Sequence, residues 1–271
     1  ATNVFAIDTS VIDEKWGKPT VVYGGGLSED QIQSTRELFD IEDTNNVYET
    51  SVDANDLYNY LGIAGGDTSS LISSVMVQKQ DSGTGVKVKI ITQSNITKIT
   101  SNQYANAAIT AGVSDVEIDV ASVSKVTGES ALTGVYKALE ANGETLDSDR
   151  TQVAQDELET TNEIAQNNAD NSNFDSARLD QALVEIKQEL AEIKQNQGSA
   201  ATAEQVEQVV QDALKKFNLS DIISQDDIDK LIAFAKKYQN TSAIDSQEVL
   251  DQLNKLSGSL KNSRIFLSAA R

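Results

Sequence analysis

The fold is decided by residues 85–141, which begin GVKVKIITQSNITKITSNQYANAAITAGVSDVEIDV over residues 85–120. Apolar residues alternate with lysine at 86–90 and with acidic residues at 116–120, and this period of two predicts two strands. The small residues of 104–111 predict a helix that packs closely on a sheet and ends at Gly112 in the left-handed conformation. A second helix is expected over 129–141. Together these elements predict a compact α/β unit.

The sequence before this stretch continues the same pattern. Short apolar runs at 21–23 and 47–52 predict strands, and Ser28 and Asp53 are placed to cap the helices that follow them. Residues 72–79 and 86–91 flank a glycine-bearing connection at 81–85, which predicts an antiparallel hairpin. Along the chain the elements run β-α-β-α-β-β-α-β-α, the order of a two-layer or three-layer sandwich.

Near residue 147 the composition changes, because glycine and strand patterns give way to polar helix formers. The clearest periodicity of the chain follows, in five apolar residues spaced four, three, four and three apart: Leu179, Leu183, Ile186, Leu190 and Ile193. This is the a/d spacing of a coiled-coil seam. Since two heptads are short, we favour packing against the chain's own helices, with pairing between copies as the alternative. Three further amphipathic helices between residues 199 and 262 predict a small bundle.

We therefore expect an α+β or α/β protein, with an N-terminal mixed sheet and packed helices, followed by an α-helical region with a short heptad segment and a small helical bundle. The predicted divisions are an N-terminal arm (1–19), an α/β domain (20–146), a helical connector with the heptad seam (147–198), a small helical bundle (199–262) and a C-terminal tail (263–271). We favour an arm that folds back on its own domain over one that pairs with a sheet edge of another copy. Together with the seam, the arm and the tail supply apolar candidates for association: Val4, Phe5, Ile7, Val11, Ile12, Ile265, Phe266 and Leu267.

Composition excludes several classes of function. The chain has 42 acidic and 22 basic residues, and its formal charge of −20 repels nucleic acid and anionic lipid. Without cysteine there is no disulfide framework, and without histidine there is no Ser-His-Asp or Cys-His catalysis and no histidine-bound zinc. No run of about 18 apolar residues is present, so we expect no membrane span. The start at Ala1-Thr2-Asn3 is consistent with a removed signal peptide, although a trimmed chain looks the same.

The remaining candidates for catalysis are carboxylates and a serine-lysine pair. Glu117 and Asp119 project from the same strand face, at a spacing compatible with the carboxylate pair of a glycosidase. A strand with a solvated acidic face has the same pattern. Ser122 or Ser124 with Lys125 suggests a dyad, but no flanking motif supports it. We therefore assign no catalytic residue.

Two acidic groups suggest a calcium site, but both lie where helix N-termini attract carboxylates, and neither has the ligand spacing of an EF-hand loop. They are Asp53 with Asp56, and Asp226 with Asp227 and Asp229. We therefore predict no metal and no cofactor.

Five phrases in a fixed order resemble a known family: VYG with LS at 22–28, ISSV at 72–75 with GTG at 83–85, NIT at 95–97, YANA with TAG at 104–112, and ALTG at 131–134. Over residues 20–261 the chain resembles the YpuA-like secreted proteins of Gram-positive bacteria, known as domain of unknown function 1002. The family pattern has an acidic residue where this chain has Gly26, so no role of that carboxylate carries over. The resemblance implies export through a cleaved signal peptide and a place at or outside the cell envelope. It implies no reaction and no catalytic residue.

Our prediction is a secreted, non-enzymatic protein of the cell envelope or extracellular space. It acts by self-association, with filaments joined through the arm as one version, or by binding an envelope or host-surface component. A homo-oligomer is the expected state, with no nucleic-acid partner. The alternative is an envelope glycan hydrolase that depends on carboxylates, with Glu117 and Asp119 as its candidates.

Overall fold

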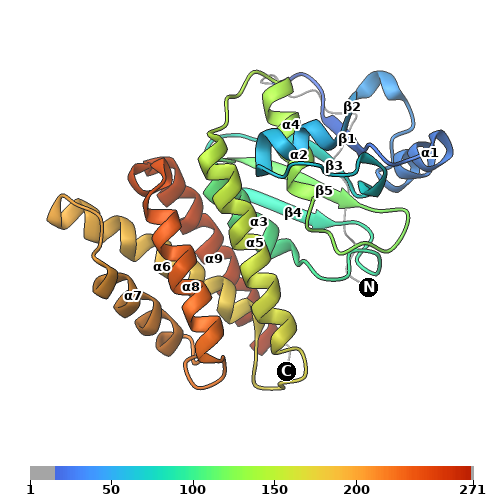
Figure 1. Cartoon of the computed structure of the whole chain (residues 1–271). Helices are drawn as coiled ribbons and strands as arrows, with labels where there is room; N and C mark the ends of the chain where they lie inside the picture. Colours follow the sequence, from blue (N-terminus) through green and yellow to red (C-terminus); the bar gives the residue numbers. More distant parts are fainter. Residues whose placement is uncertain (1–15, 270–271) are drawn as a thin grey trace.

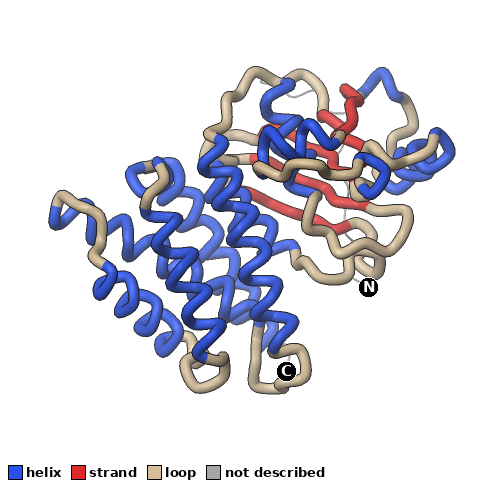
Figure 2. The backbone as a smooth tube through the Cα atoms, viewed as in Figure 1, coloured by secondary structure: helices blue, strands red, loops and turns tan. Residues whose placement is uncertain are grey.

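A computed structural model describes residues 16–269 of the chain, with side chains through residue 262. The chain has an α+β fold around one five-stranded mixed sheet (Figures 1 and 2), whose strands are β1 (Thr20–Gly24), β2 (Tyr48–Val52), β3 (Ser74–Lys79), β4 (Val86–Ile90) and β5 (Val116–Ala121). The spatial order is β2-β1-β3-β5-β4. β1 is parallel to β2 and β4 is parallel to β5, whereas β3 is antiparallel to both of its neighbours. The predicted fold class is confirmed.

Helices accompany the sheet and then form the second half of the molecule. Those of the sheet half are α1 (Glu29–Leu38), α2 (Ala54–Leu61), α3 (Ser101–Ala111) and α4 (Ala131–Ala141). Those of the helical half are α5 (Ser148–Asn167), α6 (Ser176–Gln197), α7 (Ala203–Lys216), α8 (Gln225–Gln239) and α9 (Gln247–Ala269). The predicted order of elements through α4 is confirmed, as are the caps at Ser28 and Asp53. No helix between residues 16 and 269 has the length and apolar character needed to cross a bilayer.

The predicted hairpin of residues 72–91 is wrong, because β5 lies between β3 and β4. The connection between those two strands crosses the start of β5. There the Gln80 N–H donates to the Asp115 carbonyl oxygen at 2.7 Å, and the Val116 N–H donates to the Gly85 carbonyl oxygen at 3.2 Å. Nearly every residue of β5 is buried, so this strand takes the interior position with a partner on each side. The glycines that suggested a tight turn serve a wider loop.

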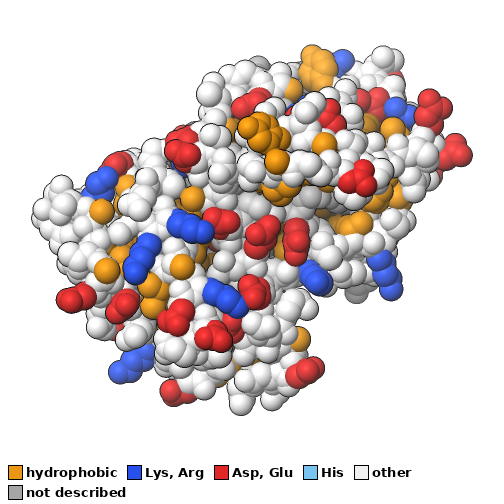
Figure 3. Space-filling model, in the orientation of Figure 1, with side chains coloured by type: hydrophobic (Ala, Val, Ile, Leu, Met, Phe, Trp, Pro, Cys, Tyr) orange, Lys and Arg blue, Asp and Glu red, His pale blue; other side chains and the backbone are white. Residues whose placement is uncertain are grey.

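The two faces of the sheet are covered differently. One face contributes Val22, Val75 and Ile118 to a core that continues without a break into the helical half. In α4, Gly134 allows close approach to the sheet, since a Cβ there would lie 2.8 Å from the Val75 side chain. On the other face, a smaller core gathers Val21 and Met76 with side chains of α1 and the segment after it. Acidic side chains are spread over both halves on the face seen in Figure 3.

The helical half packs on the sheet half through α3, which lies between β4 on one side and α5, α6 and α9 on the other (Figure 1). Every residue from Gln103 to Ala111 is buried. The heptad seam is part of the same core: its first four members are almost fully buried and Ile193 is partly buried. Thus Leu179, Leu183, Ile186 and Leu190 pack against the chain's own helices, and Ile193 packs partly against the same core.

A charged group lies at the centre of this junction. The Lys187 side chain on α6 is fully buried, and its ammonium group donates to Glu157 Oε2 at 2.8 Å, Asn106 Oδ1 at 2.6 Å and the Asn106 carbonyl oxygen at 3.1 Å. An ammonium group has three N–H donors, so all of them are used. The second carboxylate oxygen of Glu157 accepts from the Thr110 hydroxyl at 2.6 Å. Burial lowers the pKa of Lys187, and the Glu157 carboxylate opposes that shift.

We predict that Lys187→Met destabilises the protein by about 3–5 kcal/mol, because it leaves the Glu157 carboxylate buried without its cation. The matched control is Lys194→Met on the same helix. Lys194 is 2.8 Å from Asp245 in a pair whose side chains are 30% and 64% exposed. Such a pair contributes about 0–1 kcal/mol. Urea unfolding of both variants measures the difference, and equal losses would contradict the account.

Candidate functional site

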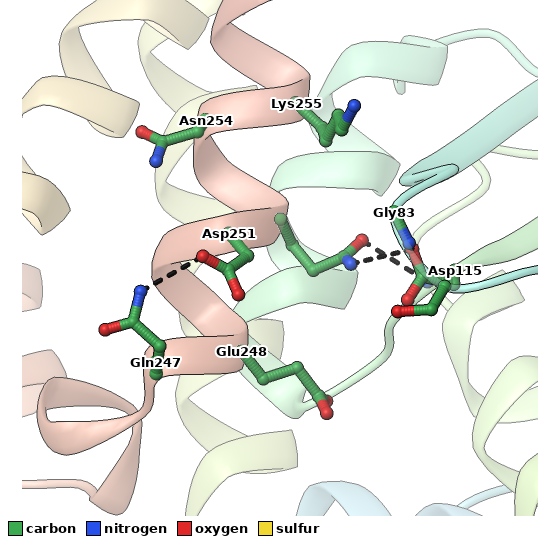
Figure 4. Close-up of a pocket in the computed structure, with 9 residues that line it drawn as sticks. Gly83, Asp115, Gln247, Glu248, Asp251, Asn254 and Lys255 are labelled. Atoms are coloured by element: carbon green, nitrogen blue, oxygen red, sulfur yellow. Dashed lines mark hydrogen bonds between the residues drawn. The ribbon is translucent and has the colours of Figure 1, made fainter.

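A cleft of about 650 Å³ lies between α9 and the loop that joins β3 to β4 (Figure 4). One wall consists of polar side chains of α9: Gln247, Glu248, Asp251, Gln252, Asn254 and Lys255. They recur at helical spacing, opposite the buried residues Val249, Leu253 and Leu256, so one amphipathic helix supplies both the core and the cleft. The other wall is formed by Ser82, Gly83 and Asp115. The volume lies within the range of about 300–1,000 Å³ typical of small-molecule sites, and the side chains that line the cleft are polar.

Asp115 and Gln252 bond to each other where the two walls meet, and they form the floor of the cleft. Asp115 Oδ1 accepts hydrogen bonds from the Gly83 N–H at 3.1 Å, the Gly85 N–H at 2.9 Å and Gln252 Nε2 at 2.9 Å. The Asp115 N–H donates in return to Gln252 Oε1 at 3.3 Å. The same contacts hold the loop over the start of β5 and tie α9 to the sheet.

These hydrogen bonds also decide the charge state of Asp115. Burial alone would raise the pKa of its carboxyl group, but the donors from Gln252, Gly85 and Gly83 outweigh burial and the pKa is lowered. Asp115 is therefore an ionised, preorganised part of the wall.

The rim of the cleft is exposed and carries two carboxylates, Glu248 and Asp251. In Figure 4, Glu248 extends from α9 toward the wall that carries Asp115. Asp251 accepts from Gln247 Nε2 through Oδ1 at 3.0 Å, and Lys255 is the cation of the lining. Carboxylates and amides arranged in this way bind amines, guanidinium groups or hydroxyl groups.

The carboxylates predicted for catalysis, Glu117 and Asp119, do not line this cleft. Asp119 is fully buried in the sheet, between Met76 on β3 and Lys89 on β4, and Glu117 is half-buried. A glycan cannot reach Asp119 in this position. The Ser122 hydroxyl is also buried and donates to the Ser124 carbonyl oxygen at 2.6 Å, so it is not directed at Lys125.

The acidic groups considered for calcium serve their helices. Asp53 and Asp56 form a reciprocal capping box, and Asp56 also pairs with Lys137 at 2.8 Å. Asp227 lies in the first turn of α8, where its N–H donates to Ser224 Oγ. Among the residues that the structure describes, no three acidic side chains come together as a metal site would require.

Most of the terminal residues predicted to take part in association lie outside the part of the chain that the structure describes. Residues Val4, Phe5, Ile7, Val11 and Ile12 precede the described part of the chain. The backbone of α9 continues through residues 265–267, but the side chains of Ile265, Phe266 and Leu267 lie outside the described set. Their role in association stays a prediction.

We predict that Asp115→Asn destabilises the protein by about 1–2 kcal/mol at neutral pH, because an amide loses the charge-assisted part of three hydrogen bonds. A carboxyl group whose pKa is lowered by folding stabilises the protein above its ordinary value of 3.8, and this stabilisation is lost as the pH falls through the lowered pKa. The difference between the native protein and the variant should therefore shrink in urea titrations below that value. A difference of equal size at neutral and strongly acidic pH would contradict the assignment.

Comparison with known proteins places the chain in a family. It is similar to the uncharacterized protein YpuA of Bacillus subtilis (strain 168), with 32% identity over 217 residues that cover 78% of this chain and 69% of the relative. No solved structure matches it. The model of the family described as "Protein of unknown function (DUF1002)" matches residues 23–256, a range that includes every residue lining the cleft. The chain therefore belongs to the DUF1002 family.

Proposed function

We propose that this chain is a non-enzymatic protein of the cell envelope or extracellular space that acts by binding, and that the cleft between α9 and the 80–85 loop is its binding site. The observation that carries the proposal is the contrast between the two parts of that cleft. Its floor is fixed by the bonds between Asp115 and Gln252, while the side chains of its rim are exposed. A rigid base under exposed polar groups costs little reorganisation when a ligand binds.

The chemistry of the rim indicates the class of ligand. Glu248 and Asp251 are one turn apart on α9, so their carboxylates face the same cleft. With a formal charge of −20, the chain as a whole repels phosphate-rich polymers. An envelope or host component that carries amino groups fits both observations.

Two other versions of the function have less support. Self-association through the arm and the tail rests on side chains outside the described residues. The heptad seam packs against other helices of the same chain. A glycan hydrolase that uses Glu117 and Asp119 needs both carboxylates in a concave site, whereas Asp119 is buried. The place at the envelope rests on the resemblance to YpuA-like secreted proteins.

The test is co-sedimentation with purified peptidoglycan sacculi whose stem peptides carry free amino groups. The double variant Glu248→Gln with Asp251→Asn should raise the apparent Kd at least about tenfold, because two charge-assisted hydrogen bonds become neutral ones. Acetylation of the amino groups should weaken binding of the native protein in the same way.

The matched control is Glu204→Gln with Glu207→Gln on α7, which removes two exposed carboxylates at the same three-residue spacing. This variant should bind like the native protein. If the native protein stays in solution, or if both double variants lose binding equally, the cleft is not the site.

A further inference from the structure

A second cleft, of about 370 Å³, lies beside the edge strand β2, at the end of the sheet where β1 and β2 begin. Its lining combines two aromatic side chains with hydroxyl and amide groups. Trp16 is the only tryptophan of the chain and is half-buried, whereas Tyr48 is 52% exposed. Few large apolar side chains are this exposed in the described part of the molecule. An exposed aromatic ring that lines a cleft indicates a surface for a ligand.

The polar groups of this cleft come from three elements. Asn142, directly after α4, donates through Nδ2 to Thr20 Oγ1 at 2.9 Å and to the Ala138 carbonyl oxygen at 2.7 Å. These two bonds hold the amide in one orientation. Neither Asn142 Oδ1 nor the hydroxyls of Tyr48 and Thr50 are hydrogen-bonded to another residue of the described part. The cleft thus offers two hydroxyls and an amide oxygen next to aromatic rings.

The carboxylate that lines this cleft already has partners. The Glu49 carboxylate accepts from Arg36 Nε at 2.8 Å and Arg36 Nη2 at 3.3 Å, and also from the Tyr23 hydroxyl. The Lys18 ammonium lies 5.1 Å from the centre of the Tyr48 ring, where it makes a cation–π contact. Glu49 is the one charged residue among those that line the cleft, and Arg36 already pairs with it.

We propose that this cleft binds a neutral saccharide unit, stacked against Tyr48 and Trp16. A pyranose ring has a face of weakly positive C–H groups, which suits the negative face of an aromatic ring, and a rim of hydroxyls that donate and accept hydrogen bonds. The cleft supplies both partners and no free charge. The volume lies within the range of about 300–1,000 Å³ typical of ligand sites. This inference does not depend on the acidic cleft at α9, which is lined by different residues.

Trp16 provides the test, because all tryptophan fluorescence of the native protein arises in this cleft. The full chain is titrated with three neutral probes, chitotetraose, cellotetraose and maltotetraose, and with tetragalacturonate as an anionic control. At least one neutral probe should give a saturable change in emission. Tyr48→Ala should weaken that binding about tenfold through loss of the stacking ring, while Tyr48→Phe keeps the ring and should bind within about threefold of the native protein.

Two controls separate this site from general effects. Tyr58→Ala removes a tyrosine on α2 that is 61% exposed and outside this cleft, and it should leave the titration unchanged. The double variant Glu248→Gln with Asp251→Asn should also leave it unchanged, which distinguishes failure here from failure of the α9 cleft.

Four results would overturn the proposal. They are the absence of a saturable signal with all three neutral probes, equal affinity of Tyr48→Ala and the native protein, equal binding of tetragalacturonate, and a change in Trp16 emission that follows protein concentration without saccharide. The last result would identify the cleft as a contact between copies of the chain.

Discussion

Lys187 lies where the sheet half and the helical half of the molecule meet, and its buried ammonium group requires acceptors from both. Asn106 comes from α3 of the sheet half, and Glu157 comes from α5 of the helical half. A cation in such a place is costly unless every N–H is bonded, so the arrangement of α3, α5 and α6 is specified closely. The small residues of α3 permit the close packing, and its polar residues provide the bonds. The two halves therefore share one core instead of forming separate units.

The α9 cleft depends on this shared core, whereas the cleft lined by Trp16 and Tyr48 is built from the sheet half alone. The α9 cleft exists only because a helix of the C-terminal half is held against the start of β5, where Gln252 and Asp115 bind each other. The second cleft, lined by Trp16 and Tyr48, lies at the starts of β1 and β2. The strand pairing makes β1 and β5 run in the same direction. The two clefts thus belong to the same end of the sheet. One is acidic and the other neutral, so they suit different chemical groups of a ligand.

Much of the fold could be predicted from local patterns. The alternation at 86–90 and 116–120 gave two strands, the small residues of 104–111 gave a closely packed helix, and capping residues placed helix starts. The hairpin prediction was wrong because a glycine-bearing loop has the same sequence pattern in two cases. The strands that it joins can pair directly, or a third strand can lie between them. The α9 cleft was missed because Asp115 and Gln252 are 137 residues apart, and neither has a neighbouring motif.

Because the two halves share one core, they should unfold together, and the single tryptophan makes this directly measurable. Trp16 reports on the sheet half, whereas far-UV ellipticity is dominated by helices, most of which belong to α5 through α9. Urea unfolding followed by both signals on the native chain should give superimposable curves with one midpoint. If the fluorescence and ellipticity transitions separate, the halves are independent, and the shared core around Lys187 does not join them as described.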